Sequence, residues 1–272
     1  MCLARSLLIF FVKIYYMSIY TTEITSDQIP SDNPLHQRLL KAYHAAAPFV
    51  VGDVLELGCG EGRGVDIIAK NANSYLALDK IPEVINTLAE QFPDQSFRQA
   101  TFPPIDQPDE RFDTVVNFQV IEHIKDDHLF LKEIARLLRP GGKAIISTPN
   151  IKMTLSRNPW HTREYTGDEL AEIAGKYFCH VDMRGIAGNE RVMEYHEKNR
   201  ASVQKIMKWD VLDLQYRLPG WILQRPYEFL NRRNRNKLQT GNDALVEAIA
   251  QDDYFLREQD DRNLDLFCIL TK

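Results

Sequence analysis

A glycine-rich run preceded by an acidic residue is the segment best suited to bind a ligand. It reads Val54-Leu55-Glu56-Leu57-Gly58-Cys59-Gly60-Glu61-Gly62-Arg63-Gly64. Glycines between a strand and a helix let the backbone and the helix N-terminus approach a ligand closely. A dinucleotide fingerprint needs Gly-x-Gly-x-x-Gly, and its third glycine position holds Arg63, Val65 or Ile67 in the three registers. The spacing therefore argues against a dinucleotide.

Two acidic residues near the run select among the remaining ligands. Glu56 stands two residues before the first glycine. Its carboxylate would repel a pyrophosphate but favours the ammonium end of S-adenosylmethionine (SAM), which carries no phosphate. Asp79 ends Ala77-Leu78-Asp79-Lys80, and a carboxylate at a strand tip can accept both hydroxyls of a ribose. NAD enzymes place an acid there too, so the loop and Glu56 together predict SAM as the cofactor.

Histidines further along the chain are candidates for handling the proton of a methyl acceptor. His123 follows the fourth predicted strand, and an imidazole titrates near neutral pH. The alternative is a histidine that packs or caps at a helix start. His161, Glu164 and Tyr165 lie in a loop after the fifth predicted strand. We expect His161 to be the second catalytic candidate and Glu164 and Tyr165 to contact substrate; alternatively, the loop only closes over the cofactor.

No cluster of acidic or amide ligands is evident at the predicted strand tips, so the sequence predicts no metal site. The four cysteines, Cys2, Cys59, Cys179 and Cys268, are scattered and form no CxxC pair. Their distribution favours a reducing, cytoplasmic setting over a disulfide framework or a zinc site.

Short apolar segments alternate with helix-length segments, a pattern typical of a parallel sheet with right-handed crossovers. We expect an α/β fold: a doubly wound, seven-stranded, mostly parallel Rossmann-like sheet with an antiparallel last strand and a helical insertion before it. The predicted strands are Asp53–Leu57, Ser74–Asp79, Phe97–Ala100, Phe112–Phe118, Lys143–Ser147, Cys179–Gly185 and Leu264–Thr271. The predicted helices are Asn33–Pro48, Gly62–Asn71, Pro82–Phe92, Asp126–Leu138 and Gly167–Tyr177.

The chain is expected to divide into an N-terminal extension (1–32), an α/β core (33–188), a helical insertion or cap (189–262) and the final core strand (263–272). Leu7–Tyr16 is apolar, but Lys13 interrupts it and it is shorter than the roughly 20 residues of a membrane span. We therefore expect no stable membrane insertion, and Met17 is a plausible natural start.

The insertion carries two clusters with open interpretations. The basic residues could face an anionic substrate or RNA, or could form a solvated helix end. The aromatic residues could wall a substrate pocket or pack a small helical core. A net charge of -5 argues against the whole chain being a polyanion binder. The basic cluster is Arg225, Arg232, Arg233, Arg235 and Lys237, and the aromatic cluster is Trp209, Tyr216, Trp221, Tyr227 and Phe229.

Three segments resemble a known family. Residues 55–62 resemble motif I of the class I SAM-dependent methyltransferases. Residues 112–124, which contain Gln119-Val120-Ile121-Glu122-His123-Ile124, and Leu138-Arg139-Pro140-Gly141-Gly142 resemble the two blocks that follow it. Within that class the chain is most similar to the small-molecule group around ubiquinone-biosynthesis methyltransferases. The resemblance covers roughly residues 35–185, and the insertion lies outside it.

The resemblance implies specific cofactor contacts. Glu56, Gly58 and Gly60 should hold the methionine end of SAM, with Gln119 nearby, and Asp79 should bind the ribose. Lys80 and Ile81 should lie against the adenine. Family members often carry an acid after the third strand, beside the adenine amino group. This chain reads Arg98-Gln99-Ala100-Thr101 there, so Gln99 and Ala100 occupy that place and Gln99 or Thr101 would substitute for the acid.

The sequence therefore predicts an enzyme that transfers a methyl group from SAM to an oxygen or carbon of a small-molecule acceptor. Asn117-Phe118-Gln119-Val120 is not the Asn/Asp-Pro-Pro-Tyr/Phe loop common in nucleobase amine methylation. Two alternatives remain. One is an RNA or protein methyltransferase that uses the basic insertion, although nucleic acid is not the expected partner. The other is a SAM-fold scaffold without catalytic activity.

Overall fold

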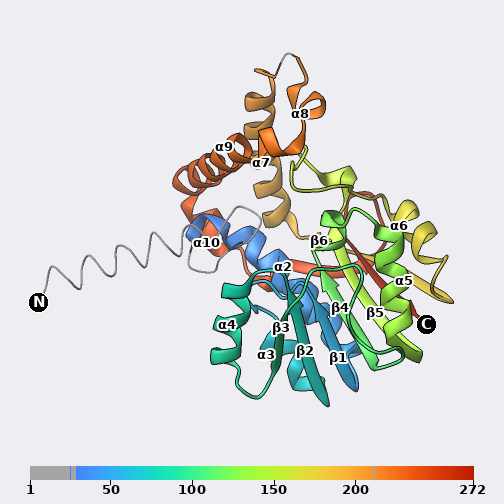
Figure 1. Ribbon diagram of the computed structural model, residues 1–272. Coiled ribbons are helices and arrows are strands. Elements are labelled where there is room, and N and C mark those ends of the chain that lie inside the picture. The colour runs from blue at the N-terminus through green and yellow to red at the C-terminus, as the bar shows by residue number, and fades with distance from the viewer. Residues whose placement is uncertain (1–24, 26–28, 211) are drawn as a thin grey trace, which may run out of the picture.

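The computed structural model describes residue 25 and residues 29–210 and 212–272 (Figure 1). The expectations for the apolar stretch at 7–16 and for Met17 lie outside these residues. The strands are β1 (Asp53–Leu57), β2 (Ser74–Asp79), β3 (Ser96–Gln99), β4 (Phe112–Phe118), β5 (Leu138–Pro149), β6 (His180–Gly188), β7 (Tyr254–Glu258) and β8 (Asp265–Thr271). The helices are α2 (Asn33–Ala46), α3 (Val65–Ile68), α4 (Pro82–Gln91), α5 (Asp127–Leu137), α6 (Gly167–Ala174), α7 (Glu190–Met207), α8 (Leu214–Arg217), α9 (Gly220–Gly241) and α10 (Asp243–Ala248).

The strands form one mixed sheet in the order β3-β2-β1-β4-β5-β8-β6-β7. The five strands from β3 to β5 are parallel, and β8 pairs antiparallel with both β5 and β6. The predicted α/β fold with a parallel core and an antiparallel last strand is confirmed. The chain order reverses between β1 and β4, which opens a crevice at the carboxyl ends of these two strands.

The predicted number of strands is wrong by one. The segment 189–262 contains the helices α7 to α10, but Tyr254–Glu258 forms β7, which pairs antiparallel with the edge of β6. Tyr254 is buried while Phe255 is exposed, so the strand hides one side only. Its five residues include Arg257 and Glu258, which mask a strand pattern in the sequence. The division of the chain into domains stays a prediction.

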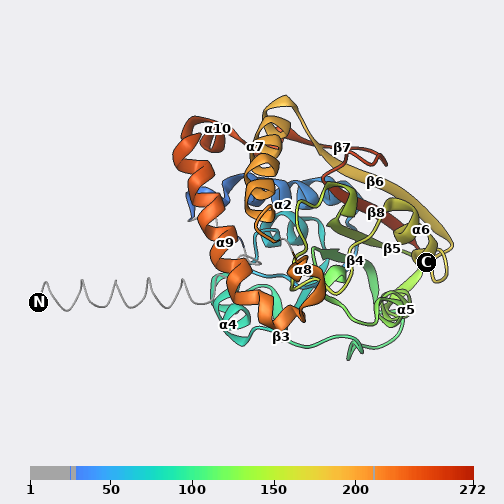
Figure 2. The same cartoon turned by 90° about the horizontal axis from the view of Figure 1, so that it is seen from above.

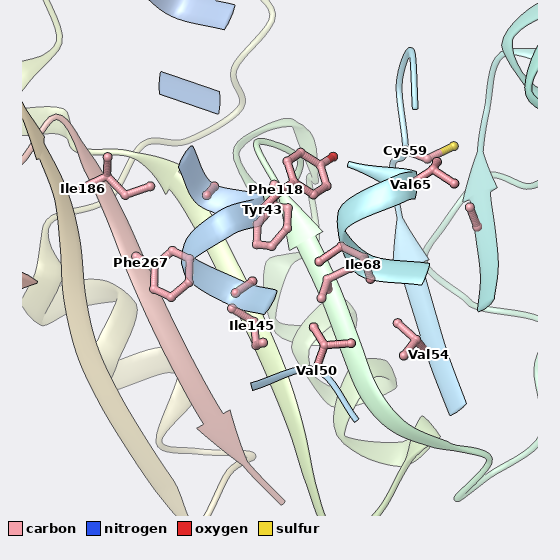
Figure 3. Packing of buried hydrophobic residues seen from close by; sticks show 14 of the residues in the cluster. Tyr43, Val50, Val54, Cys59, Val65, Ile68, Phe118, Ile145, Ile186 and Phe267 are labelled. Carbon is pink, nitrogen blue, oxygen red and sulfur yellow. The ribbon is translucent and has the colours of Figure 1, made fainter. Parts of the chain in front are cut away.

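Helices cover both faces of the sheet, and the period-two alternation of each strand decides which face a residue joins. On β1, Val54 points to the layer formed by α2, α3 and α4, whereas Leu55 and Leu57 point to the layer formed by α5 and α6. Figure 3 shows the first layer, where the ring of Tyr43 on α2 lies beside Phe118 at the end of β4. Glu56 has the same parity as Val54, so its carboxylate enters that layer.

Helices α7 and α9 lie side by side at the top of the molecule, across α2 (Figures 1 and 2). Buried Asn234 of α9 donates to Asn199 of α7 and accepts from Ser202. Asp32 is fully buried just before α2. Its Oδ1 lies 2.6 Å from Nη1 of Arg232 and 3.0 Å from Nη1 of Arg235. These contacts hold the cap, defined here as α7, α8 and α9, against the core. Within the described residues, none of the helices combines the length and the apolar character that crossing a membrane demands.

The first prediction concerns this anchor. Asp32→Asn leaves two arginines without their shared buried carboxylate, so we expect the free energy of unfolding to fall by about 3 kcal/mol. Chemical denaturation measures the loss, and limited proteolysis should cut the cap first. Asp94→Asn, at an exposed aspartate of the loop after α4, is the control. Equal stability of the two variants would show that the ion pairs do not anchor the cap.

Candidate active site

The glycine loop leaves the tip of β1 and makes a tight turn toward α3. Gly58 donates to the Leu78 carbonyl at 2.8 Å, which ties the loop to β2. Gly58 and Gly60 adopt left-handed φ angles of +82° and +48°. A side chain at Gly58 would collide with Val120, whereas a Cβ at Gly60 would meet no protein atom within 4 Å. The open face of Gly60 therefore leaves a cradle at the strand tip, where a ligand can approach the backbone closely.

Asp79 lies across this cradle at the tip of β2. Its carboxylate accepts hydrogen bonds from the backbone amides of Gly60 and Ile81, both at 3.0 Å. The side chain is 8% exposed, so it is fixed by the protein while one edge still reaches the surface. The loop N–H groups, Asp79 and the open face of Gly60 form a donor and acceptor set that fits the amino-acid and ribose parts of SAM.

The other predicted cofactor residues also gather at the strand tips. Lys80 and Gln99 are exposed, and the Gln99 amide donates to the Lys80 carbonyl at 3.3 Å. The Ala100 amide donates to the Asp79 carbonyl at 2.8 Å. Gln119 follows β4 with a left-handed φ of +58° and donates its backbone N–H to Ser147. Their cofactor contacts stay predictions, but the fold brings them to one edge.

Glu56 is buried beneath the loop rather than exposed on it. The hydroxyls of Tyr43, at 2.8 Å, and Tyr75 donate to its two carboxylate oxygens. Burial raises the pKa of Glu56 to about 7, and the hydrogen bonds from the two tyrosines oppose that rise. The sequence did not single out either tyrosine as a site residue, because each reads as an ordinary apolar-face residue of its helix or strand.

A cavity of about 260 Å³ lies between the carboxyl edge of the sheet and the cap. Gln119 and His123 reach it from the loop after β4, and His161 and Glu164 reach it from the loop after β5. Side chains of α2, α7 and α9, among them Tyr227, close the other sides. The structure therefore brings four of the predicted residues into one cavity, beside the cradle of the glycine loop.

His161 is held by neighbours on both ring nitrogens. Its Nδ1 lies 2.6 Å from a carboxylate oxygen of Glu164, and Nε2 lies 2.8 Å from the amide nitrogen of Asn158. Since Asn158 can donate there and Glu164 can only accept, this arrangement fits a neutral ring with the proton on Nδ1. The other carboxylate oxygen of Glu164 accepts from Thr154. Glu164 thus orients His161 rather than standing alone as a substrate contact.

His123 and Glu122 complete the cluster. Burial lowers the pKa of His123 to about 4, so this ring is neutral at pH 7. Its Nδ1 lies 3.1 Å from the Trp160 carbonyl. Burial raises the pKa of Glu122 to about 7; its carboxylate accepts from Thr148. Glu122 is a site residue that the sequence reading missed, although it directly precedes His123.

Ligand atoms of Glu122, His123 and His161 all lie within 4.8 Å of one another, so the three could hold a metal ion. The sequence predicted no metal site because the third donor comes from a loop 38 residues after His123, a distance that hides the cluster. Glu122 and His161 already have side-chain partners in Thr148 and Glu164. The geometry is therefore compatible with proton transfer or with metal ligation.

Tyr165 lies outside the cavity lining. Its ring is fully buried, and its hydroxyl donates to Asp127 at 2.9 Å. Tyr165 directly follows Glu164, and its side chain points away from the cavity into the core layer formed by α5 and α6. We therefore assign Tyr165 no substrate contact.

The aromatic and the basic clusters of the insertion each contain residues that lie in different environments. Of the aromatic residues Tyr227 lines the cavity, whereas Trp209, Tyr216, Trp221 and Phe229 are exposed. The expectation that they pack a small helical core is therefore wrong for these four. In the basic cluster, Arg232 and Arg235 bind Asp32, and Arg225, Arg233 and Lys237 are exposed.

Comparison with known proteins agrees with this geometry. The model of the methyltransferase domain family matches residues 55–146. A probable S-adenosylmethionine-dependent methyltransferase of Mycobacterium tuberculosis is 36% identical over 189 residues, which cover 66% of this chain and 68% of that protein. A ubiquinone biosynthesis O-methyltransferase of Parvibaculum lavamentivorans is 34% identical over 110 residues, 39% of this chain and 44% of the relative.

Structural similarity extends over more of the chain. The crystal structure of a SAM-dependent methyltransferase from Thermotoga maritima superposes with a TM-score of 0.55, and the match covers 88% of this chain and 91% of that one. The sequence identity is 14%, so this match shows the fold alone. A Rossmann-like sheet with a glycine cradle at its switch point is typical of proteins that bind a nucleoside-containing cofactor. With the sequence relatives, it follows that the chain belongs to the SAM-dependent methyltransferases.

The second prediction tests the cradle. Gly60→Ala adds a methyl group to the open face at the strand tip, so we expect at least tenfold weaker SAM binding by calorimetry. Gly141→Ala is the matched control, because Gly141 also has a left-handed φ, of +78°, and open space beside it. Both variants should lose about 1 kcal/mol of stability from the backbone conformation. Unchanged affinity in Gly60→Ala would place the cofactor elsewhere.

The third prediction concerns the buried Glu56 carboxyl in the ligand-free protein. Its folded-state pKa of about 7 lies above the ordinary value of 4.5, so the folded chain keeps a proton that the unfolded chain releases. The free energy of unfolding should therefore fall by roughly 3 kcal/mol from this group as the pH rises from about 4.5 to 7.

Denaturation curves at several pH values measure this dependence. Glu56→Gln should remove the share of this group and leave the similar share of buried Glu122, whose pKa is also about 7, whereas Glu90→Gln at an exposed position of α4 should leave the whole dependence unchanged. A slope as steep in Glu56→Gln as in the wild type would show that Glu56 does not hold this proton.

Proposed function

We propose that this protein transfers the methyl group of SAM to an oxygen or carbon of a small molecule bound in the cavity beneath the cap. The observation that carries the proposal is the position of His161, held by Glu164 and Asn158 in the cavity between the carboxyl edge of the sheet and the cap. A volume of about 260 Å³ suits a small acceptor.

His161 is the proposed general base. Its interaction with Glu164 fixes the proton on Nδ1, which leaves the Nε2 lone pair to accept a proton from an acceptor hydroxyl or carbon acid. The acceptor would replace the Asn158 amide at Nε2. SAM supplies a methyl carbon activated by its sulfonium, so much of the remaining catalysis is alignment of the acceptor with that carbon.

Neutral His123 suits a site next to a sulfonium. Because burial lowers its pKa to about 4, the ring adds no positive charge near the methyl donor at pH 7. Its Nδ1 faces the Trp160 carbonyl, so the ring keeps one orientation, and its second nitrogen can accept a hydrogen bond from substrate. We propose that His123 positions the acceptor while His161 takes its proton.

Oxygen is the favoured acceptor atom. The Parvibaculum lavamentivorans relative is named an O-methyltransferase, and its similarity covers 39% of this chain. The RNA alternative loses support because Arg232 and Arg235 of the basic cluster hold Asp32 inside the protein. Turnover of hydroxylated small molecules, followed as formation of S-adenosylhomocysteine by mass spectrometry, tests the assignment. Full SAM affinity with no product from any small acceptor would favour a non-catalytic scaffold.

The fourth prediction concerns the general base. His161→Ala should lower kcat by a hundredfold or more while the SAM dissociation constant stays within about twofold. His180→Ala, at an exposed histidine of β6, is the control and should keep wild-type kcat. Wild-type turnover in His161→Ala would remove this residue from the mechanism.

Treatment with a chelator distinguishes a role of His161 in proton transfer from a role in metal ligation. If His161 acts as a base, prolonged treatment with EDTA followed by dialysis should leave kcat unchanged. Loss of activity that Mn²⁺ or Zn²⁺ restores would instead make Glu122, His123 and His161 metal ligands.

A further inference from the structure

The exposed hydrophobic side chains of this protein concentrate at one end of the cap. Of the twelve large hydrophobic residues exposed in the described chain, eight lie between residues 209 and 230. Trp209 is 89% exposed, Trp221 73% and Tyr216 67%. Isolated surface hydrophobics need no explanation, but such a concentration on a monomer marks an interaction surface. Besides Trp209, Tyr216 and Trp221, the eight exposed residues of this segment are Leu212, Leu214, Ile222, Phe229 and Leu230.

The same segment carries an excess of positive charge. Residues 205–237 contain eight Lys or Arg and three Asp or Glu, a net charge of +5 in a chain whose total is -5. Arg232 and Arg235 bind Asp32, but the remaining cations are exposed, and the described residues supply no ion-pair partner for them. They are Lys205, Lys208, Arg217, Arg225, Arg233 and Lys237. We call residues 205–233 the cap tip.

Exposed tryptophans and tyrosines among lysines and arginines favour a membrane surface as the partner. Trp and Tyr rings reside at the headgroup level of a bilayer, where one end is apolar and the other is wet. Interfacial helices pair Trp, Phe and Leu on one face with Lys and Arg on the other. Lysines and arginines near an anionic leaflet add electrostatic attraction to such binding.

Other partners explain less of this composition. RNA would account for the cations and for stacking on aromatic rings, but not for Leu212, Leu214, Ile222 and Leu230. The core of a protein interface is depleted in lysine and other charged residues, whereas here Lys208 adjoins Trp209 in the chain. The cap tip itself carries six Lys or Arg and three Asp or Glu, a net charge of +3, which complements an anionic leaflet, while the acidic remainder of the molecule would be repelled by it.

We propose that the cap tip docks on the surface of an anionic lipid bilayer, with Trp209, Tyr216 and Trp221 in the headgroup region. No span is involved, in keeping with the lengths and compositions of the described helices. Helices α7 and α9 run from the tip to the cavity, which they wall with Tyr195 and Tyr227 among others. Docking would thus bring the cap and its cavity to the lipid surface, whatever acceptor the enzyme uses.

Vesicle binding of the full-length protein tests the proposal. We expect wild-type protein to co-sediment with phosphatidylcholine vesicles that contain 30% phosphatidylglycerol and not with pure phosphatidylcholine. Trp209→Ser/Trp221→Ser and Lys208→Glu/Arg225→Glu should each lower the bound fraction at least tenfold. Brominated lipid should quench wild-type tryptophan fluorescence but not that of the tryptophan double variant, which retains Trp160.

Two matched variants control for hydrophobicity and charge elsewhere on the surface. Val51→Ser removes an exposed hydrophobic residue before β1, and Lys70→Glu/Lys132→Glu reverses two exposed lysines far from the tip. Both should bind vesicles like wild type. Circular dichroism and SAM affinity of the tip variants should match wild type, which shows that they fold and that docking is separate from methyl transfer.

Three results would overturn the proposal. Failure of the wild-type protein to bind anionic vesicles would refute membrane docking. Tip variants that bind these vesicles as well as the wild type would also refute it. Tight binding of a 30-nucleotide RNA that depends on Lys208 and Arg225, without vesicle binding, would reassign the tip to nucleic acid. None of these results would affect methyl transfer, which turnover of a soluble acceptor reports independently.

Discussion

The buried carboxylate of Glu56 is the interaction around which the cofactor edge is arranged. It lies at the junction of β1, β2 and α2, and the hydroxyls of Tyr43 and Tyr75 donate to it from two of these elements. An unpaired carboxylate at that depth would be costly, so both tyrosines must stay in place. The ring of Tyr43 also packs against Gly64, where a Cβ would lie 1.8 Å from a ring carbon. The position of the glycine loop therefore depends on the same contact that satisfies Glu56.

The cavity arises from a second constraint, the packing of the cap on the sheet. The parallel strands deliver Gln119 and His123 to their carboxyl ends, but such an edge is open to water unless another element covers it. Here α7 and α9 cover it, and Asp32 joins α9 to the start of α2 through two arginines. Residues far apart in the chain thus enclose one volume, in which the neutral His123 and the oriented His161 can act on a bound molecule.

Much of the cofactor edge could be predicted from local patterns. The glycine spacing, Glu56 two residues earlier and Asp79 at the end of the next strand are all short-range signals, and the fold places them at adjacent strand tips as expected. The strand β7 could not be predicted in this way, because Tyr254–Glu258 is short, carries charges and is stabilised by pairing with β6 rather than by its own pattern. The same limit applies to Glu122, which matters only because His161 approaches it from a loop 39 residues away.

The sequence by itself determined the α/β class, the methyl donor and the edge of the sheet at which the predicted cofactor residues lie. These depend on backbone conformation and strand periodicity, which a few neighbouring residues specify. Only the tertiary structure decided what the insertion does with its aromatic and basic residues. Tyr227 turns toward the cavity, Arg232 and Arg235 toward Asp32, and Trp209 and Trp221 toward solvent. Residues of the same type therefore point in different directions within the insertion. The direction of each side chain follows from how α7 and α9 pack against the core.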